Sequence, residues 1–190
     1  MKRSRPAREV TSLYTAEQRA RRDASRWTLV QGVLAPVQFL IFAVSLVLVL
    51  RFLVGGHGEG AAVASVLLKT LALYTIMVTG ALWERDVYGQ YLFAPAFWWE
   101  DAVSMVVIAL HTLYVVMWLF DIGGTTVQMG VALAAYATYL VNAAQFVWKL
   151  RRARLGAAAA ARDTGTARDA AGTPGPGVAL PTFAGTGPAS

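Results

Sequence analysis

Two groups of charged side chains stand where apolar segments of this sequence end and begin. Glu84, Arg85 and Asp86 close one apolar segment, and Glu100 and Asp101 open the next. A carboxyl group kept neutral by an apolar surrounding can donate its proton, so acids placed here are candidates for general acid and base catalysis. The alternative is helix-end electrostatics, because an acidic residue stabilises a helix N-terminus without taking part in any chemistry.

Two further ionisable residues, Lys69 and His111, lie near the middle of consecutive apolar segments and at similar depth. Ionisable groups inside a membrane are energetically expensive and are functional candidates by default. A ligand-binding or proton-relay role is therefore one interpretation. The other is structural: a lysine that reaches the interface or bonds a backbone carbonyl, and a histidine bonded to a neighbouring helix.

Helical geometry relates these groups to one another. At 100° per residue, Glu100, Ser104 and His111 fall on one stripe within about 40°, whereas Asp101 lies to the side. Glu100 and His111 are about 16 Å apart along the axis, so they cannot touch each other. Both could touch one broad, flat ligand.

Polar and aromatic residues recur around these acids. Two polar stripes lie on the first and last apolar segments, one at Gln31, Gln38 and Ser45 and one at Thr138, Asn142 and Gln145. They indicate either hydrogen bonds between helices or the lining of a cleft. The aromatic residues of the stretch 83–99, among them Tyr91, Phe97 and Trp98, are typical either of an interfacial belt or of a wall for an aromatic ligand.

The elements that must position these residues are membrane-spanning helices. Hydrophobic residues make up 56% of the 190 residues and charged ones only 15%. Four apolar segments, about 27–54, 61–83, 98–120 and 127–148, have the roughly 20 residues that a bilayer core requires. No period-two alternation favours a barrel. The sequence therefore predicts an all-α fold, a bundle of four transmembrane helices.

Charge and composition set the orientation and exclude several classes of protein. Eight of the seventeen Lys and Arg residues precede Trp27, and six lie from Lys149 onward. This distribution predicts that both termini lie in the cytoplasm. It also argues against nucleic-acid binding, because the charges flank apolar spans. The absence of cysteine excludes disulfides and thiolate chemistry. No phosphate-binding loop, zinc motif or dinucleotide fingerprint is present, so no cofactor and no protein-bound metal are expected.

The segments outside the spans have a simpler composition. Residues 1–26 are expected to form a basic cytoplasmic segment. Within it, Thr15 and Gln18 indicate a capping box that opens a short surface helix to about Ala24. Residues before Leu13 are expected to be disordered. The domain of four spans covers 27–150. Residues 151–190 are basic and then rich in Ala, Gly and Pro, so disorder is expected after Leu155.

Several stretches, taken together, resemble one family. They are 27–39 (WTLVQGVLAPVQF), 69–84 (KTLALYTIMVTGALWE), 91–105 (YLFAPAFWWEDAVSM), 111–114 (HTLY) and 135–146 (AYATYLVNAAQF). This pattern resembles the 2-vinyl bacteriochlorophyllide hydratase family over roughly residues 14–155. The stretch 91–105 is the most specific of the five.

The resemblance implies a hydro-lyase of bacteriochlorophyll synthesis that adds water to the C3 vinyl group of chlorophyllide a, or a related chlorin, to give a 1-hydroxyethyl group. Hydration of a vinyl group needs an acid that protonates carbon and a base that activates water. We expect Glu84 and Glu100 in these roles, with Asp101 next and Lys69 as a substitute acid. His111 is the expected ligand of the substrate magnesium.

The remaining expectations concern the binding of the chlorin and its setting. Side chains expected to contact the substrate are Ser104, Tyr91, Phe97, Trp98, Gln38 and Asn142. The resemblance implies a multi-pass protein of a bacterial cytoplasmic or intracytoplasmic photosynthetic membrane, in a lipid bilayer beside neighbouring enzymes of the pathway. Two alternatives stay open: a non-catalytic chlorin carrier or photosystem assembly protein, which would need no paired carboxyls, and a small transporter, which the lack of matched halves disfavours.

Overall fold

The computed structural model describes residues 14–171, and every regular element in that range is a helix. Five helices follow one another along the chain: α1 (Ala16–Ala24), α2 (Arg26–Gly55), α3 (Glu59–Tyr88), α4 (Trp98–Leu119) and α5 (Gly124–Ala171). Four of them are long and apolar enough to cross a membrane: α2, α3, α4 and the part of α5 from Gly124 to Gly156. The predicted all-α bundle of four spans is confirmed.

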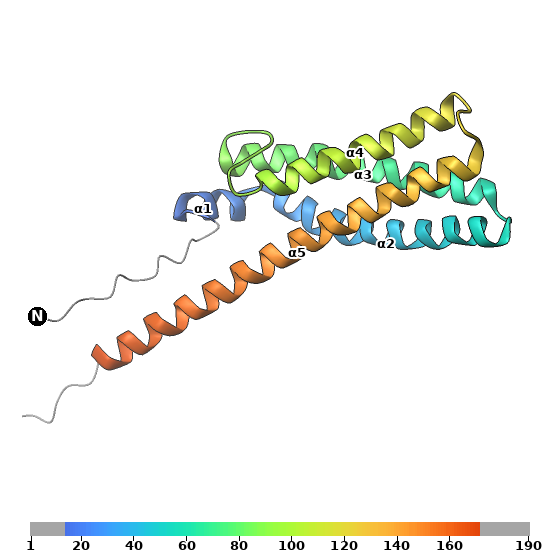
Figure 1. Ribbon diagram of the computed structural model, residues 1–190. Coiled ribbons are helices and arrows are strands. Elements are labelled where there is room, and N and C mark those ends of the chain that lie inside the picture. The colour runs from blue at the N-terminus through green and yellow to red at the C-terminus, as the bar shows by residue number, and fades with distance from the viewer. Residues whose placement is uncertain (1–13, 172–190) are drawn as a thin grey trace, which may run out of the picture.

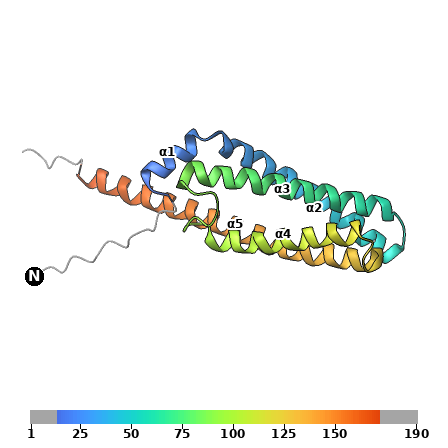
Figure 2. The same cartoon turned by 90° about the horizontal axis from the view of Figure 1, so that it is seen from above.

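The four long helices form two antiparallel hairpins that lie side by side (Figures 1 and 2). Helix α2 packs along α3, and α4 packs along α5. Both hairpin turns, at 56–58 and 120–123, lie at one end of the bundle, which we call the turn end. Helix α1 and the loop 89–97 lie at the opposite end, which we call the α1 end.

Local sequence signals explain where the helices start and stop. At the start of α1, the Thr15 side chain accepts from the Gln18 N–H and the Gln18 side chain accepts from the Thr15 N–H, the predicted capping box. Ser25 caps α2 directly afterwards. Helix α3 ends at Tyr88 and is capped by Gly89, whose φ of 81° lies in the left-handed region that glycine adopts without a steric penalty.

Buried hydroxyl groups fix the register of the helices toward the turn end. Ser45 of α2 lies within hydrogen-bond distance of both Ser65 of α3 (2.7 Å) and Tyr136 of α5 (2.5 Å). Around them, Phe42 packs against the rings of Tyr136 and Tyr139 at centroid distances of 5.3 and 5.0 Å. The outer faces are apolar instead, with exposed residues such as Leu29, Leu40, Leu71 and Val141, as expected of surfaces that face lipid.

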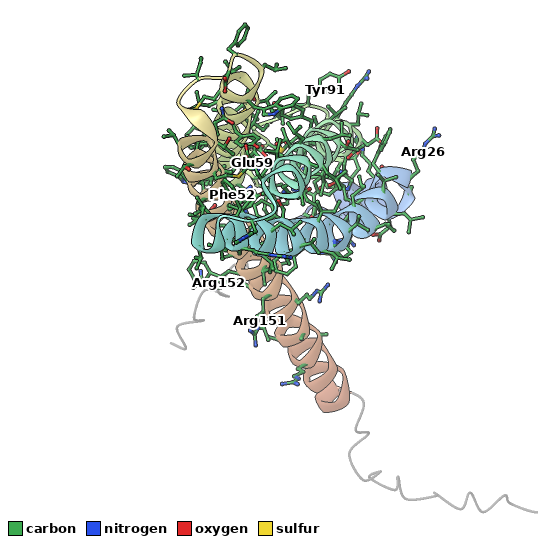
Figure 3. The ribbon with its side chains drawn as sticks, turned by 90° about the vertical axis from the view of Figure 1, so that its right-hand side faces the viewer. Arg26, Phe52, Glu59, Tyr91, Arg151 and Arg152 are labelled. Atoms are coloured by element: carbon green, nitrogen blue, oxygen red, sulfur yellow. The ribbon has the colours of Figure 1, made fainter. Side chains whose placement is uncertain are left out.

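The observed ends of the chain differ from the boundaries that composition suggested. Helix α5 continues to Ala171, well past Leu155, after which disorder was expected. Its residues 157–161 are all alanine, the residue with the highest helix propensity, and this explains the extension. The exposed side chains of Arg26 and Arg151 point away from the bundle (Figure 3). The expectations for residues before 13 and after 171 lie outside the described residues.

Candidate active site

A cavity of about 570 Å³ lies between the two hairpins, toward the α1 end. All four long helices contribute to its wall, together with Tyr14 ahead of α1 and Leu92 of the loop 89–97. The wall is mostly apolar, and its polar side chains are few: Gln31, Gln38, Glu84, Asp101, Ser104 and Asn142. An apolar cavity with a few well-placed polar groups is typical of a small-molecule site.

Two of these polar groups are carboxyls that meet across the gap between α3 and α4. The side chains of Glu84 and Asp101 are in hydrogen-bond contact with each other, and both residues are buried, with 6% and 4% of their surface exposed. Two ionised carboxylates in contact repel strongly, so such a pair is expected to hold one proton between them. A donor and an acceptor of protons thus stand side by side on the cavity wall.

The loop between α3 and α4 holds this pair in place with adjacent backbone amides. The Phe93 N–H donates to Asp101 Oδ2 at 2.7 Å, and the Ala94 N–H donates to Glu84 Oε2 at 3.2 Å. Phe93 takes a left-handed conformation with φ of 60°, which costs a residue with a side chain about 1 kcal/mol or more. The bond to Asp101 offsets this strain, and the two amides together orient the two carboxyls.

A second polar group lies one turn deeper on α4. Ser104 follows Asp101 by three residues, so both lie on the face of α4 that lines the cavity. Asn142 Nδ2 donates to Ser104 Oγ at 2.7 Å, which leaves the serine hydroxyl hydrogen available for another acceptor. A water molecule bound by this hydroxyl would lie next to the carboxyl pair.

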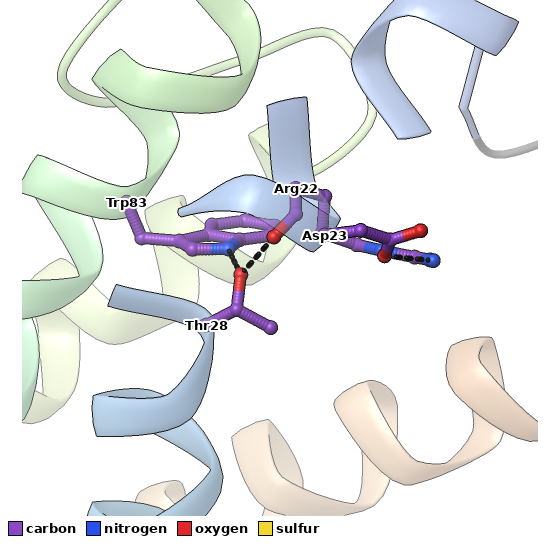
Figure 4. Close-up of polar contacts among 4 residues, drawn as sticks. All are labelled: Arg22, Asp23, Thr28 and Trp83. Carbon is purple, nitrogen blue, oxygen red and sulfur yellow. Dashed lines mark hydrogen bonds and ion pairs between the residues drawn. The ribbon is translucent and has the colours of Figure 1, made fainter. Parts of the chain in front are cut away.

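Hydrogen bonds join α1, α2 and α3 around Trp83, which lines the cavity (Figure 4). Trp83 Nε1 donates to Thr28 Oγ1 at 3.0 Å, and the Thr28 hydroxyl donates to the Arg22 carbonyl at 2.6 Å. Tyr14 stacks on Tyr88 with ring centroids 6.1 Å apart. Burial raises the pKa of the Tyr14 phenol, so this ring stays neutral and forms part of the apolar wall.

Glu100, expected as the base, takes a different position from Asp101. Its carboxylate forms an ion pair with Lys149 Nζ at 2.7 Å, and the same ammonium group donates to the Ala96 carbonyl. Glu100 is buried but does not line the cavity. Its contacts join the start of α4 to α5.

Lys69 and His111 lie deeper in the bundle, and neither lines the cavity. The Lys69 ammonium sits 3.8 Å from the ring centroid of Tyr139, which does line it. His111 Nδ1 lies 2.8 Å from the Val107 carbonyl, an acceptor, so Nδ1 carries the hydrogen. Lys69 Nζ and His111 Nε2 have no hydrogen-bond partner within residues 14–171.

The expected binding residues divide into two groups. Gln38, Phe97, Ser104 and Asn142 line the cavity, whereas Tyr91 and Trp98 do not, with 51% and 49% of their surface exposed. Tyr91 stands at the edge of the bundle (Figure 3), and Arg85 lies over its ring. Trp83, Gln31 and Tyr139 also line the cavity but were not among the expected site residues. Trp83 belongs to the aromatic stretch 83–99, and Gln31 to a polar stripe for which the lining of a cleft was one interpretation.

The fold and the cavity define a four-span membrane protein with an internal cavity that carries a buried carboxyl pair. The chain belongs to the 2-vinyl bacteriochlorophyllide hydratase family: the family model of that description, 2-vinyl bacteriochlorophyllide hydratase (BCHF), matches residues 14–152. The expected family membership is confirmed.

Two curated relatives carry the name 2-vinyl bacteriochlorophyllide hydratase. The one from Cereibacter sphaeroides is 65% identical over 156 residues, which cover 82% of this chain and 96% of the relative. The one from Rhodobacter capsulatus is 64% identical over 162 residues, which cover 85% of this chain and 91% of the relative. No solved structure matches the chain.

Proposed function

We propose that this protein hydrates the peripheral vinyl group of a magnesium chlorin, chlorophyllide a or a close relative, to a 1-hydroxyethyl group. Relatives that cover most of the chain bear the corresponding name. The structural observation that carries the proposal is the pair of carboxyls, Glu84 and Asp101, on the wall of an otherwise apolar cavity.

The first step is a proton transfer from the carboxyl pair to the terminal carbon of the vinyl group. The vinyl π electrons form the new C–H bond and leave cationic character on the carbon attached to the macrocycle, where conjugation spreads the charge. Both carboxyls are then ionised, and the Phe93 amide holds Asp101 while the Ala94 amide holds Glu84. An anion beside the cation lowers the energy of the transition state.

In the second step, water attacks the cationic carbon and loses a proton to the carboxylate. The C–O bond forms from a lone pair of the water, and the released proton restores the single proton of the pair. Ser104, three residues beyond Asp101, is placed to hold this water through its hydroxyl group. The cycle consumes one water and needs no electron transfer.

This mechanism pairs Glu84 with Asp101 in preference to Glu100. Glu100 is held by Lys149 and lies outside the cavity lining, so we propose that it stabilises the start of α4. Lys69 lies about 22 Å from Glu84 along the axis of α3, because fifteen residues separate them. It is therefore too remote from the carboxyl pair to be the acid.

We further propose that the α1 end of the bundle faces the cytoplasm of a photosynthetic bacterium. The basic residues near that end, Arg19 and Arg26 at the start and Arg151 and Arg152 in α5, follow the positive-inside rule. Residues 55–60 contain no Lys or Arg. In this orientation the substrate enters from the cytoplasmic side of the membrane.

The activity test uses membranes from a heterologous host that makes the full chain, supplied with chlorophyllide a in water enriched in oxygen-18. The proposal predicts a product heavier by one water, with the label in the new hydroxyl group and without added nucleotide, metal or oxidant. Incorporation of oxygen from O₂, or a strict need for a reductant, would rule out the hydratase assignment. Binding of chlorophyllide without turnover would support a carrier instead.

A further inference from the structure

The amide of Gln31 is held in one orientation on the cavity wall. Its Nε2 donates to Thr79 Oγ1 at 2.7 Å and lies 3.3 Å from the Ile76 carbonyl. The Thr79 hydroxyl donates its own hydrogen to the Thr75 carbonyl, so it acts as an acceptor toward Gln31. Because both partners accept, the nitrogen must be the atom that faces α3, and the amide cannot be flipped.

This arrangement leaves Oε1 as the atom of Gln31 that can serve a ligand. The residues next to it on the cavity wall are small: Gly32 and Ala35 on α2, and Gly80 and Ala81 on α3. A Cβ at Gly80 would meet both atoms of the amide, at 3.8 and 3.9 Å. Glycine at this position lets the amide pack closely on α3, and the small residues leave room beside it for a flat ring.

The depth of Gln31 matches the centre of a macrocycle whose edge lies at the carboxyl pair. Its partner Thr79 precedes Glu84 by five residues, which is about 7.5 Å along the axis of α3. A peripheral vinyl group lies at a comparable distance from the centre of a chlorin. A ring with its vinyl group at Glu84 and Asp101 therefore has its magnesium at the level of Gln31.

We propose that Gln31 Oε1 is the axial ligand of the substrate magnesium. The four ring nitrogens leave an axial position open, and an uncharged carbonyl oxygen is a ligand that suits this hard cation. The inference rests on the proposed function. It gives Gln31 the role first expected of His111, whose ring lies outside the cavity lining.

The test compares the binding of two pigments, chlorophyllide a and pheophorbide a, which differ only in the replacement of magnesium by two protons. Purified full-length protein in nanodiscs should bind chlorophyllide a at least tenfold more tightly than pheophorbide a. Gln31→Met keeps the length of the side chain but removes the oxygen, so it should abolish this preference and leave the affinity for pheophorbide a within about twofold.

His111→Leu is the matched control, and it should leave the ratio of the two affinities unchanged. Retention of the preference in Gln31→Met, or its loss in His111→Leu alone, overturns the proposal. Equal affinities of the wild-type protein for the two pigments overturn it as well, even if Gln31→Met fails to fold. None of these readouts requires turnover, so failure of this proposal is distinct from failure of the hydratase assignment.

Discussion

Glu84 and Asp101 come from different helices, yet their carboxyl groups are in contact, and two adjacent amides of the loop between those helices bind one oxygen of each. A short connection therefore positions both members of the pair at once. This relationship separates Asp101 from its neighbour Glu100, which bonds to α5 instead.

Loss of the Glu100–Lys149 pair should affect stability more than chemistry. Glu100→Gln removes a charge-assisted hydrogen bond at a mostly buried position, and such bonds contribute roughly 1.5–3 kcal/mol. We expect a lower unfolding midpoint, measured by thermal denaturation in detergent, and turnover within a fewfold of the wild-type value. A double-mutant cycle with Lys149→Met checks the assignment, since additive effects of the two substitutions would contradict a direct interaction.

The Ser104 hydroxyl should matter for the water step rather than for the binding of pigment. Ser104→Ala removes the hydroxyl that we assign to the attacking water, and we expect turnover to fall about tenfold, or about 1.4 kcal/mol in the barrier. Chlorophyllide affinity, measured by absorbance titration, should change little. The control is Thr138→Val, which removes a hydroxyl on α5 that bonds only its own helix and does not line the cavity. A larger effect of the control would contradict the assignment.

The hydrogen bonds that join α1, α2 and α3 around Thr28 predict a local change in dynamics. Thr28→Val removes both the acceptor for Trp83 Nε1 and the donor to the Arg22 carbonyl, while keeping the shape of the side chain. Amide hydrogen exchange of residues 16–24 should become faster, and exchange in α4 should stay the same. Unchanged protection of α1 would show that its position does not depend on these bonds.

The spans and the position of Glu84 near the end of one of them could be predicted from sequence because they depend on local signals. Apolar length gives the four helices, and Glu84 is recognisable as an acid at the end of one of them. Which of the two neighbours, Glu100 or Asp101, lines the cavity could not be predicted in this way. A helical projection gives the angle between residues of α4 but not which arc faces α3 and which faces α5.

The depth of the cavity was also not accessible from sequence. Lys69 and His111 were expected site residues because they are ionisable. Neither lines the cavity, although Tyr139, whose ring contacts the Lys69 ammonium, does. Gln31 stood out only as part of a polar stripe, since its orientation depends on Thr79 and Ile76 of another helix. Contacts between helices, rather than residue type, decide which polar groups face the cavity.

The topology makes a prediction that is independent of the chemistry. A reporter fused after Leu155 should report a cytoplasmic position, because it lies among basic residues. A reporter inserted at Gly58, in the turn between α2 and α3, should report an external position, because that turn has no Lys or Arg. Alkaline phosphatase and green fluorescent protein fusions give opposite signals in the two compartments. The same compartment for both positions would contradict the assignment of the spans.

The most direct test of the account is single-turnover conversion of saturating chlorophyllide a by four variants of the full chain. Glu84→Gln and Asp101→Asn should still bind the pigment but lose rate by 10²–10⁴-fold, the usual contribution of a general acid or base. Glu100→Gln and Asp86→Asn remove neighbouring carboxyls that do not line the cavity, and both should react at nearly the wild-type rate. Near-normal rates in Glu84→Gln and Asp101→Asn, or a loss in Glu100→Gln as large as theirs, would contradict the assignment of the carboxyl pair.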